Sequence, residues 1–316
     1  MKLIRKQIAR LYKHFILLKF YSKKNDFSSV QPKRRIIVCF DGNVPHGGLV
    51  DRLKGIISLY EISKILDYEF KIFFKHPFEL TSFLEPNLVD WIIKEEELKY
   101  NFFNSKIVYL INDFKTAPLH FFEKSKAKTF FVYCNVDYLS GFYPDKNENE
   151  INEIWRNNYN NLFKTSEYLQ NKLDVLHSGP RIAFHTRFTT LMGDFTDTTK
   201  TILNEKEKLD LAQKVIKAID NEVKQYLDKI VYVFSDSEFF LNYVRLNTKY
   251  KTLSGVPKHL ENDSSDIDYH CKTFIDFYFL VDSDCVFLVK MNQMYHSSFS
   301  KYAAIIGDTK FKRIIN

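Results

Sequence analysis

The chain of 316 residues is poor in glycine and cysteine and lacks several common enzyme motifs. It has only 9 Gly, and neither G-x-G-x-x-G nor G-x-x-x-x-G-K-[ST] occurs, so neither a standard dinucleotide site nor a P-loop is supported. Cys39, Cys134, Cys271 and Cys285 are widely spaced, with no C-x-x-C pair and no neighbouring His cluster. We therefore expect no zinc site and no redox motif, and scattered thiols fit a reducing cytoplasm.

Long uncharged apolar runs are also absent. No 18-residue uncharged stretch exists, which excludes a spanning helix. Charges interrupt the early apolar stretch and no small-residue cleavage site follows it, so a cleavable signal peptide is not evident. We expect the protein to stay in the cytoplasm.

Positive charge is concentrated at the N-terminus. Residues 1–35 hold eleven Lys and Arg against Asp26 alone, and the remainder of the chain has a formal charge near −3. No nucleic-acid partner is expected, because the basic excess is local and no recognition motif occurs.

The first twenty residues carry apolar side chains at helical spacing. These are Ile4, Ile8, Leu11, Phe15 and Leu18. Lys and Arg occupy much of the remaining surface, so the pattern predicts a basic amphipathic helix. The helix either binds an anionic surface, on the inner face of the cytoplasmic membrane, or is an ordinary helix packed on the body or a frayed terminus.

Length and composition predict two folded α/β domains. The chain is 45% hydrophobic and 16% aromatic, which supports large cores, and it exceeds the usual size of a single core. We predict a helix and linker over residues 1–35, a first domain over 36–175 and a second over 176–316. The crossover is placed in the polar region 147–173, which is predicted to be helical.

Short apolar runs alternate with helical patterns along both halves. Strands are expected at residues 36–40, 70–74, 107–110, 129–133, 181–185, 230–234 and 285–289. Helices are expected at residues 49–66, 206–226 and 238–246. Two Rossmann-like halves explain this order, and ligands of such sheets bind beyond the carboxyl ends of the strands.

The most informative loop follows the strand at 181–185. His185 and Arg187 stand where the sheet opens. A guanidinium can donate two parallel hydrogen bonds to a diphosphate and stabilise the charge on a departing group. The alternative is an Arg paired with a nearby carboxylate such as Asp194.

A second candidate loop joins the first strand to the first long helix. Gly47 and Gly48 allow a ligand to approach the backbone and the helix N-terminus, and Asp51 and Arg52 follow one turn later. A G-G pair alone is weak evidence, because many such turns are only structural.

Three further segments carry polar groups. Ser235 and Asp236 contact a nucleotide or, with Ser237, cap the next helix. Asp276 can accept hydrogen bonds from ribose or base, and Ser297, Ser298 and Phe299 either bind phosphate or form a helix N-cap. Residues 282–284 match D-x-D, which also fits a turn, and we assign no metal there.

Taken in order, these motifs resemble the fucosyltransferase superfamily, which includes protein O-fucosyltransferases, α1,6-fucosyltransferases and bacterial polysaccharide enzymes. The matches span residues 36–315: Gly47-Gly-Leu-Val-Asp51-Arg-Leu-Lys-Gly55, His185-Thr-Arg187, Gly255-Val-Pro257-Lys-His259, Thr273-Phe-Ile-Asp276-Phe and Ser297-Ser-Phe-Ser300. One departure is that Gly193 and Asp194 lie several residues after Arg187, where the superfamily has a compact H-x-R-x-G-D.

The resemblance implies a GT-B-like fold of two Rossmann-like domains facing a cleft, with metal-independent, inverting transfer from a GDP-sugar, expected to be GDP-fucose. It implies that Arg187 contacts the β-phosphate, His185 lies near the nucleotide, Asp276 reaches ribose or guanine, and residues 297–299 close the phosphate pocket. The Gly-rich loop, with Asp51 or Arg52, is implied to face acceptor and donor.

The resemblance and the N-terminal helix suggest a glycan or lipid-linked glycan acceptor in bacterial surface polysaccharide synthesis. A general base is expected among His46, Asp41, Asp51 and Asp194, and the sequence does not choose between them. The alternatives are a transferase using another nucleotide sugar, and a catalytically silent glycan-binding protein on the same fold.

Overall fold

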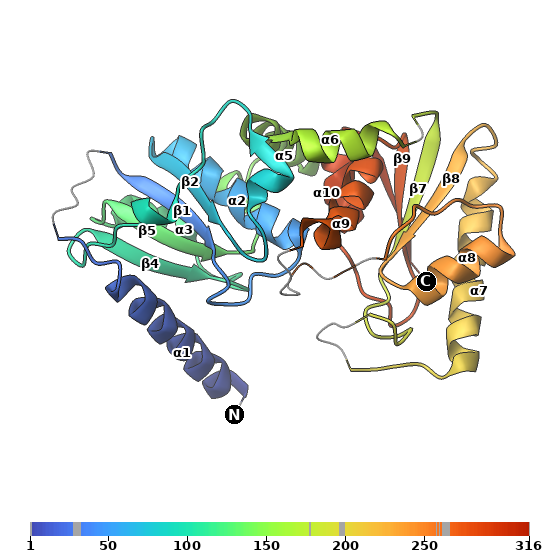
Figure 1. Ribbon diagram of the computed structural model, residues 1–316, viewed down its shortest axis with the longest axis horizontal. Coiled ribbons are helices and arrows are strands. Elements are labelled where there is room, and N and C mark those ends of the chain that lie inside the picture. Colours follow the sequence, from blue (N-terminus) through green and yellow to red (C-terminus); the bar gives the residue numbers. More distant parts are fainter. Residues whose placement is uncertain are drawn as a thin grey trace. The chain divides into compact units, whose positions relative to one another are not determined.

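A computed structural model describes residues 2–27, 33–176, 178–195, 200–256, 258, 260 and 266–315, with the side chains of residues 2–7 and 9 excepted (Figure 1). The chain divides into two compact units, the first ending at Lys164 and the second beginning at Thr165. This boundary lies inside the 147–173 crossover region and precedes the division predicted at residue 175. It comes early because α6 (Glu167–Asp174) packs on α9 (Ile267–Val281) of the second unit, with Tyr168 donating a hydrogen bond to Asp268.

The first unit is built on a parallel four-stranded sheet in the order β2-β1-β5-β4. Its strands are β1 (Arg35–Phe40), β2 (Glu69–Phe74), β4 (Ser105–Leu110) and β5 (Thr129–Cys134). Every residue of the central strands β1 and β5 is buried, as apolar strands covered on both faces require. The four strands predicted for this half are confirmed.

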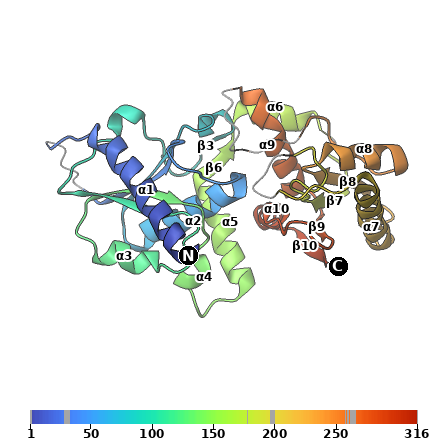
Figure 2. The ribbon, with the colours of Figure 1, turned by 90° about the horizontal axis from the view of Figure 1, so that it is seen from below.

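Helix α2 positions the first loop of this unit. It lies between the sheet and α5, so its residues are buried on several sides (Figure 2). Gly55 permits the close approach, because a Cβ there would come 2.2 Å from the carbonyl oxygen of Cys134. The helices after β1 are α2 (Leu49–Ile65), α3 (Pro118–Lys124), α4 (Leu139–Phe142) and α5 (Glu148–Leu162). Two short turns, η1 (Leu80–Ser82) and η2 (Glu95–Glu97), and the pair of short strands β3 (Leu84–Pro86) and β6 (Phe163–Thr165) complete the unit.

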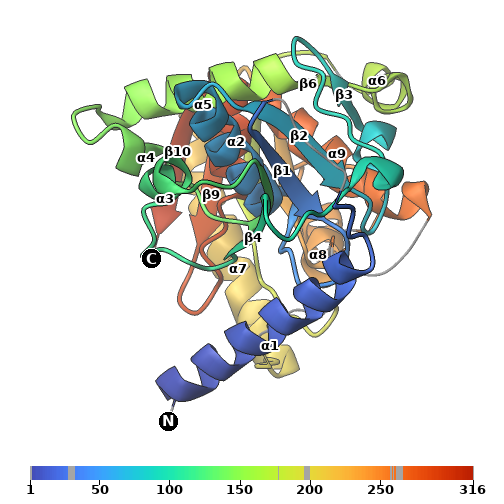
Figure 3. The same ribbon diagram turned by 90° about the vertical axis from the view of Figure 1, so that its left-hand side faces the viewer.

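The N-terminal helix expected from the sequence is α1 (Lys2–Ser22) (Figure 3). Arg10 donates hydrogen bonds to Tyr109 O at 2.9 Å and to Asp113 at 2.7 Å, and the buried apolar contacts come from the C-terminal half of the helix. Leu17 and Tyr21 are completely buried against aromatic side chains of β4 and β5. Ile8, Leu11 and Phe15 are 60–69% exposed, on the apolar stripe that the sequence predicted. Within the described part of the chain, no helix is long and apolar enough to cross a membrane.

The second unit contains another parallel sheet, in the order β10-β9-β7-β8. Its strands are β7 (Arg181–Thr186), β8 (Ile230–Ser235), β9 (Cys285–Lys290) and β10 (Lys310–Ile315). The sequence predicted the first three and missed β10, whose pattern is not a continuous apolar run because this edge strand is largely exposed.

Helices cover both faces of this sheet (Figure 1). Ile182 and Phe184 of β7 pack with side chains of α7 (Glu205–Val223) and α8 (Glu238–Asn247). On the other face, His185 contacts Phe299 of α10 (Phe299–Ile306), and α10 packs on α9. Alternation along β7 thus sends the neighbouring side chains of Phe184 and His185 to different helical layers.

Candidate functional site

Arg187 lies directly beyond the carboxyl end of β7. Its carbonyl oxygen accepts a hydrogen bond from Tyr295 N at 3.0 Å, which fixes the chain after the strand. Its guanidinium stacks over the Phe195 ring, with Cζ 4.5 Å from the centroid, and its Nε lies 3.2 Å from Asp236 Oδ2. The side chain keeps 21% of its surface exposed. It is therefore an oriented cation at the edge of the sheet.

Asp236, at the end of β8, organises this turn. Its Oδ1 accepts from Phe188 N at 2.8 Å and its Oδ2 from Thr189 N at 2.7 Å. Burial raises the pKa of Asp236, and Arg187 and the two backbone N–H groups oppose that rise. Asp236 thus holds Arg187 in place while being almost fully buried itself.

The neighbouring polar residues cap α8. Ser237 Oγ accepts from Phe240 N at 3.1 Å, and Asp194 Oδ2 accepts from Ser237 Oγ at 3.0 Å and Phe239 N at 2.6 Å. Ser235 Oγ, which is buried, accepts from Ser237 N. Arg187 thus pairs with Asp236, whereas Asp194 supports the start of the helix.

His185 is a buried, neutral imidazole next to Arg187 along β7. Burial and then the charge of Arg187 lower its pKa to about 3. Its ring centroid lies 5.3 Å from that of Phe299, and its Nδ1 has no hydrogen-bond partner among the described residues. The structure thus buries His185 against α10, next to the turn that carries Arg187.

The start of α10 comes to the same edge of the sheet through the contact of Phe299 with His185. Ser297 Oγ accepts from Phe299 N at 3.2 Å, and Ser298 is the N-cap residue of the helix. Phe299 also contacts Phe277 of α9, at 5.1 Å between centroids. Backbone N–H groups at a helix N-terminus favour an anion, so this end of α10 can complement Arg187.

Asp276 of α9 is buried and forms an ion pair with Lys272, one helical turn earlier. Burial raises its pKa and Lys272 opposes that rise. Sequence reasoning missed Lys272, although the i,i+4 spacing of opposite charges was a signal for it. Pro257 and His259, from the third of the resembling motifs, lie outside the described residues.

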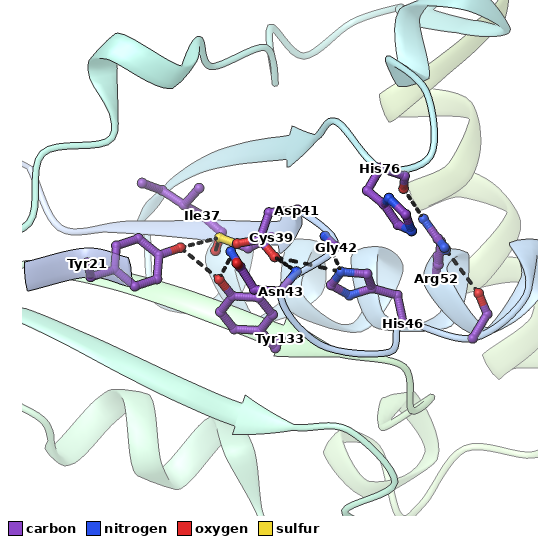
Figure 4. A network of polar contacts seen from close by, with 11 residues as sticks. Tyr21, Ile37, Cys39, Asp41, Gly42, Asn43, His46, Arg52, His76 and Tyr133 are labelled. Carbon is purple, nitrogen blue, oxygen red and sulfur yellow. Dashed lines mark hydrogen bonds and ion pairs between the residues drawn. The ribbon is translucent and has the colours of Figure 1, made fainter. Parts of the chain in front are cut away.

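In the first unit, the loop after β1 turns its polar groups inward (Figure 4). His46 is completely buried and its Nε2 accepts from Gly42 N at 3.1 Å. Burial, with Arg52 and His76, lowers its pKa to about 2. Asp41 lies 3.8 Å from His46 Nε2 and accepts from Tyr133 Oη at 2.6 Å. A neutral imidazole that already accepts a backbone hydrogen bond is suited to shaping the loop rather than to removing a proton.

Arg52 clamps the same loop from α2. It is completely buried, donates from Nε to Gly47 O at 3.0 Å and also donates to His76 O. Its guanidinium lies over the rings of Phe40 and Phe74, at 5.7 and 5.0 Å. Arg52 therefore stabilises the loop from within.

Two predicted residues of the loop remain accessible. A Cβ placed on Gly48 would meet nothing within 4 Å, and the Asp51 side chain is 45% exposed beside Lys54, at 3.0 Å. Gly47 has φ +83°, a conformation that favours glycine. Asp51 is thus the accessible carboxylate that the turn presents.

A separate cavity of ≈ 330 Å³ lies in the first unit at the end of β2. Its lining combines the buried ring of Trp91 with the charged side chains Lys75, Glu79, Glu95 and Glu96. Lys75 pairs with Glu95 at 2.6 Å, so the charges at this cavity are partly compensated.

The two carboxylates of the D-x-D segment lie at the opposite edge of the second sheet, where β7 begins. Asp284 accepts from Arg181 N at 3.0 Å and pairs with Lys229, and Asp282 lies 3.9 Å from Arg181. Across the described ranges, no group of three or more His, Cys, Asp or Glu side chains is arranged to hold a metal ion.

The fold is shared with solved fucosyltransferase structures. A mutant of Arabidopsis thaliana FUT1 in complex with GDP aligns with a TM-score of 0.57 at 11% identity, covering 95% of this chain and 74% of that one. NodZ α-1,6-fucosyltransferase soaked with GDP-fucose aligns with a TM-score of 0.52 at 15% identity, covering 87% and 93%. Fucosyltransferase NodZ from Bradyrhizobium aligns with a TM-score of 0.53 at 16% identity, covering 86% and 93%. Neither a family model nor a curated protein matches the sequence. The alignments with these three structures confirm the predicted fold class.

Proposed function

We propose that the chain is a glycosyltransferase that moves a sugar, expected to be fucose, from a GDP-sugar to a glycan hydroxyl. The observation that carries the proposal is Arg187, an oriented and partly exposed cation at the carboxyl edge of the second sheet, in a chain with the fold of fucosyltransferases. Such a cation can bind a diphosphate and offset the negative charge that grows on it as the sugar leaves.

The second unit supplies the donor side of this proposal. Arg187 contacts the β-phosphate, the N-terminus of α10 at Ser297 and Ser298 receives the same anion, and Asp276 accepts from the base or ribose. His185, being neutral, adds no repulsion to the guanidinium beside it. The leaving diphosphate is thereby stabilised by the protein's own cation and dipoles, and we propose that the transfer needs no metal ion.

The first unit supplies the acceptor side, with inversion at the anomeric carbon. Asp51 is the accessible carboxylate of the loop after β1, so we propose it as the base that takes the proton of the acceptor hydroxyl. Replacing it by Asn should lower kcat while leaving GDP affinity unchanged. Equal losses in kcat and in GDP affinity would instead mean that Asp51 binds the donor.

Nucleotide binding tests the donor proposal first. Thermal stabilisation of the wild type by GDP, UDP, ADP and CMP is measured with chelator present and then with added Mg²⁺. A ligand at 100 times its Kd adds about 2.7 kcal/mol, which is readily seen. We expect GDP to stabilise the wild type under both conditions and to fail on Arg187→Ala.

The matched control is Arg245→Ala, which removes an exposed arginine of the same unit that pairs with Glu238. It should respond to GDP as the wild type does. Turnover of GDP-fucose with a glycan acceptor follows. Preference for another nucleotide assigns a different donor, and binding without turnover favours the silent glycan-binding alternative.

The membrane role of α1 is part of the proposal, with a lipid-linked acceptor in bacterial surface polysaccharide synthesis. Leu17 and Tyr21 attach the helix to the first unit, while Ile8, Leu11 and Phe15 form an exposed apolar stripe among basic residues. That arrangement suits the surface of an anionic bilayer on the cytoplasmic side, and it tethers the enzyme where lipid-linked acceptors lie.

Vesicle co-sedimentation tests this attachment. The wild type should bind vesicles containing phosphatidylglycerol and should bind vesicles of phosphatidylcholine weakly. The double variant Leu11→Ser/Phe15→Ser should lose binding, whereas Leu227→Ser, which changes an exposed leucine of the second unit, should keep it. Equal binding by all three proteins would contradict the role of α1.

A further inference from the structure

The ion pair between Lys272 and Asp276 is buried in the second unit. The two side chains are 9% and 10% exposed, and they are joined across one turn of α9. Lys272 is confined on two sides, since its Nζ lies 5.9 Å from the Phe234 ring centroid at the end of β8, and a Cβ on Gly255 would come within 3.0 Å of its Cδ. Gly255, with φ +96°, lets the loop between α8 and α9 come close to the lysine. The lysine is therefore held in place by its surroundings.

Lys272 engages one oxygen of Asp276, Oδ1. Among the described residues, no other hydrogen bond joins this carboxylate, so Oδ2 is left to accept from a ligand. A carboxylate held in its charged form can only accept hydrogen bonds, whereas a protonated carboxyl both donates and accepts. The protonation state of Asp276 thus decides which ligand groups it can bind.

Lys272 is the charged group that acts on Asp276. Burial raises the pKa of Asp276, and Lys272 is the cation that opposes the rise. On the other elements packed against α9, the titratable groups are Glu167, Tyr168, Lys172 and Asp174 of α6, Lys301 and Tyr302 of α10, Tyr232 of β8, and Lys258 of the preceding loop. Tyr168 and Lys172 contact Asp268, and Lys258 lies over the Tyr269 ring.

We propose that Lys272 is a positioning residue that keeps Asp276 an obligate acceptor and so sets a preference for bases that donate hydrogen bonds, guanine over adenine. The inference rests on the proposed function, in which Asp276 meets the nucleotide. Guanine presents N1–H and N2–H donors on one edge, while adenine presents the N1 acceptor beside its amino group. A charged Asp276 matches the first edge and repels the lone pair of the second.

Removing the lysine should therefore make base choice depend on pH. In Lys272→Met, burial acts on Asp276 unopposed, so the carboxyl is protonated at low pH and charged only at higher pH. The protonated form donates to adenine N1 and no longer accepts both guanine N–H groups. GDP affinity should then be lost at pH 6 and recovered as pH rises, and the change in ADP affinity should have the opposite sign.

The experiment measures Kd for GDP and ADP by calorimetry at pH 6.0, 7.5 and 9.0. The wild type should prefer GDP at each pH, and in Lys272→Met the GDP-to-ADP affinity ratio should fall on the order of tenfold to a hundredfold at pH 6.0. Lys272→Arg keeps the charge and should behave as the wild type. Lys172→Met, which removes a half-exposed lysine from α6, is the matched control and should change nothing.

A buried carboxylate without its partner can prevent folding, so circular dichroism checks each variant. The double variant Lys272→Met/Asp276→Asn removes both charges, and its amide should discriminate little between GDP and ADP at any pH. A folded Lys272→Met, or this double variant, that keeps the wild-type ratio at every pH overturns the inference alone. A wild type that binds neither nucleotide overturns the proposed function, and the inference with it.

Discussion

Arg52 and Arg187 occupy comparable places in the two units and have opposite surroundings. Both lie close to the carboxyl end of a buried parallel strand, β1 in the first unit and β7 in the second. Arg52 is fully buried, donates to the carbonyls of Gly47 and His76, and lies over two phenyl rings. Arg187 stacks on one ring, pairs with Asp236 through Nε and keeps part of its surface exposed.

The difference shows that an arginine near the carboxyl end of a central strand can stabilise a loop in one unit and be available to a ligand in the other. In the first unit, the loop of residues 41–48 folds back over its own polar groups, so the guanidinium is used by backbone carbonyls. In the second unit, Asp236 fixes one edge of the guanidinium and two backbone N–H groups fix Asp236. An arginine anchored in this way can meet an anion at little further cost in side-chain entropy.

The largest expected effect is on the rate of sugar transfer in Arg187→Ala. The rate should fall roughly 10² to 10³-fold, because a preorganised donor to the leaving diphosphate is removed. Arg187→Lys should recover part of the rate, since it restores charge without the planar fork. Steady-state kinetics with GDP-fucose measure both, and turnover by Arg187→Ala within roughly threefold of the wild type would contradict the assignment.

Arg52→Met should instead act on stability. Two buried carbonyls lose their charged donor, so the free energy of unfolding should fall by roughly 2 to 4 kcal/mol. Urea unfolding measures the loss, and Arg245→Met, at an exposed pair, should cost less than about 1 kcal/mol. Should GDP binding by a stable Arg52→Met fall as far as in Arg187→Ala, Arg52 would also contact the ligand.

Two of the buried histidines, one in each unit, should make both regions sensitive to acid. His46 and His185 have pKa values of about 2 and 3, below the usual 6.5 of an unfolded histidine, so the unfolded chain binds the extra protons. Stability is then complete above pH 6.5, and each histidine removes about 1.4 kcal/mol per pH unit as the pH falls below that value.

Urea unfolding between pH 7.5 and 4.5 measures this slope. His185→Phe fills the same space beside Phe299 and should make the slope shallower by one histidine, and His46→Gln should do the same. His120→Gln, at an exposed histidine, should leave the slope unchanged. A slope that none of the three variants alters would show that acid sensitivity arises elsewhere.

The smallest effects are expected at the adjacent glycines of the first unit. Gly47→Ala should cost roughly 1 to 2 kcal/mol, because φ is +83° there. Gly48→Ala should change the free energy of unfolding by less than about 0.5 kcal/mol, because its Cβ would meet open space. Chemical denaturation compares them. Lost transfer by a stable Gly48→Ala would sharpen the comparison by placing a ligand against this loop.

Much of the fold follows from local pattern. The apolar runs at 36–40, 129–133 and 181–185 are strands because continuous apolar segments of this length suit a sheet covered on both faces. The edge strand β10 was not predicted, because Lys and Arg at its exposed positions interrupt the apolar run. It is a strand because it pairs with β9. Whether such a segment pairs with the edge of a sheet depends on a neighbouring strand, and the periodicity of its own sequence does not show that strand.

For the candidate site, the sequence by itself determined the chemistry available: a cation after β7, glycines after β1, carboxylates after β8 and on α9. Only the tertiary structure decided which of these groups already have hydrogen-bond or ion-pair partners within the protein. His46 and Arg52 are enclosed by their own loop, Asp236 rather than Asp194 holds Arg187, and Lys272 holds Asp276. The physical reason is that exposure and hydrogen-bond partners are set by packing between distant segments, whereas residue type and spacing are local.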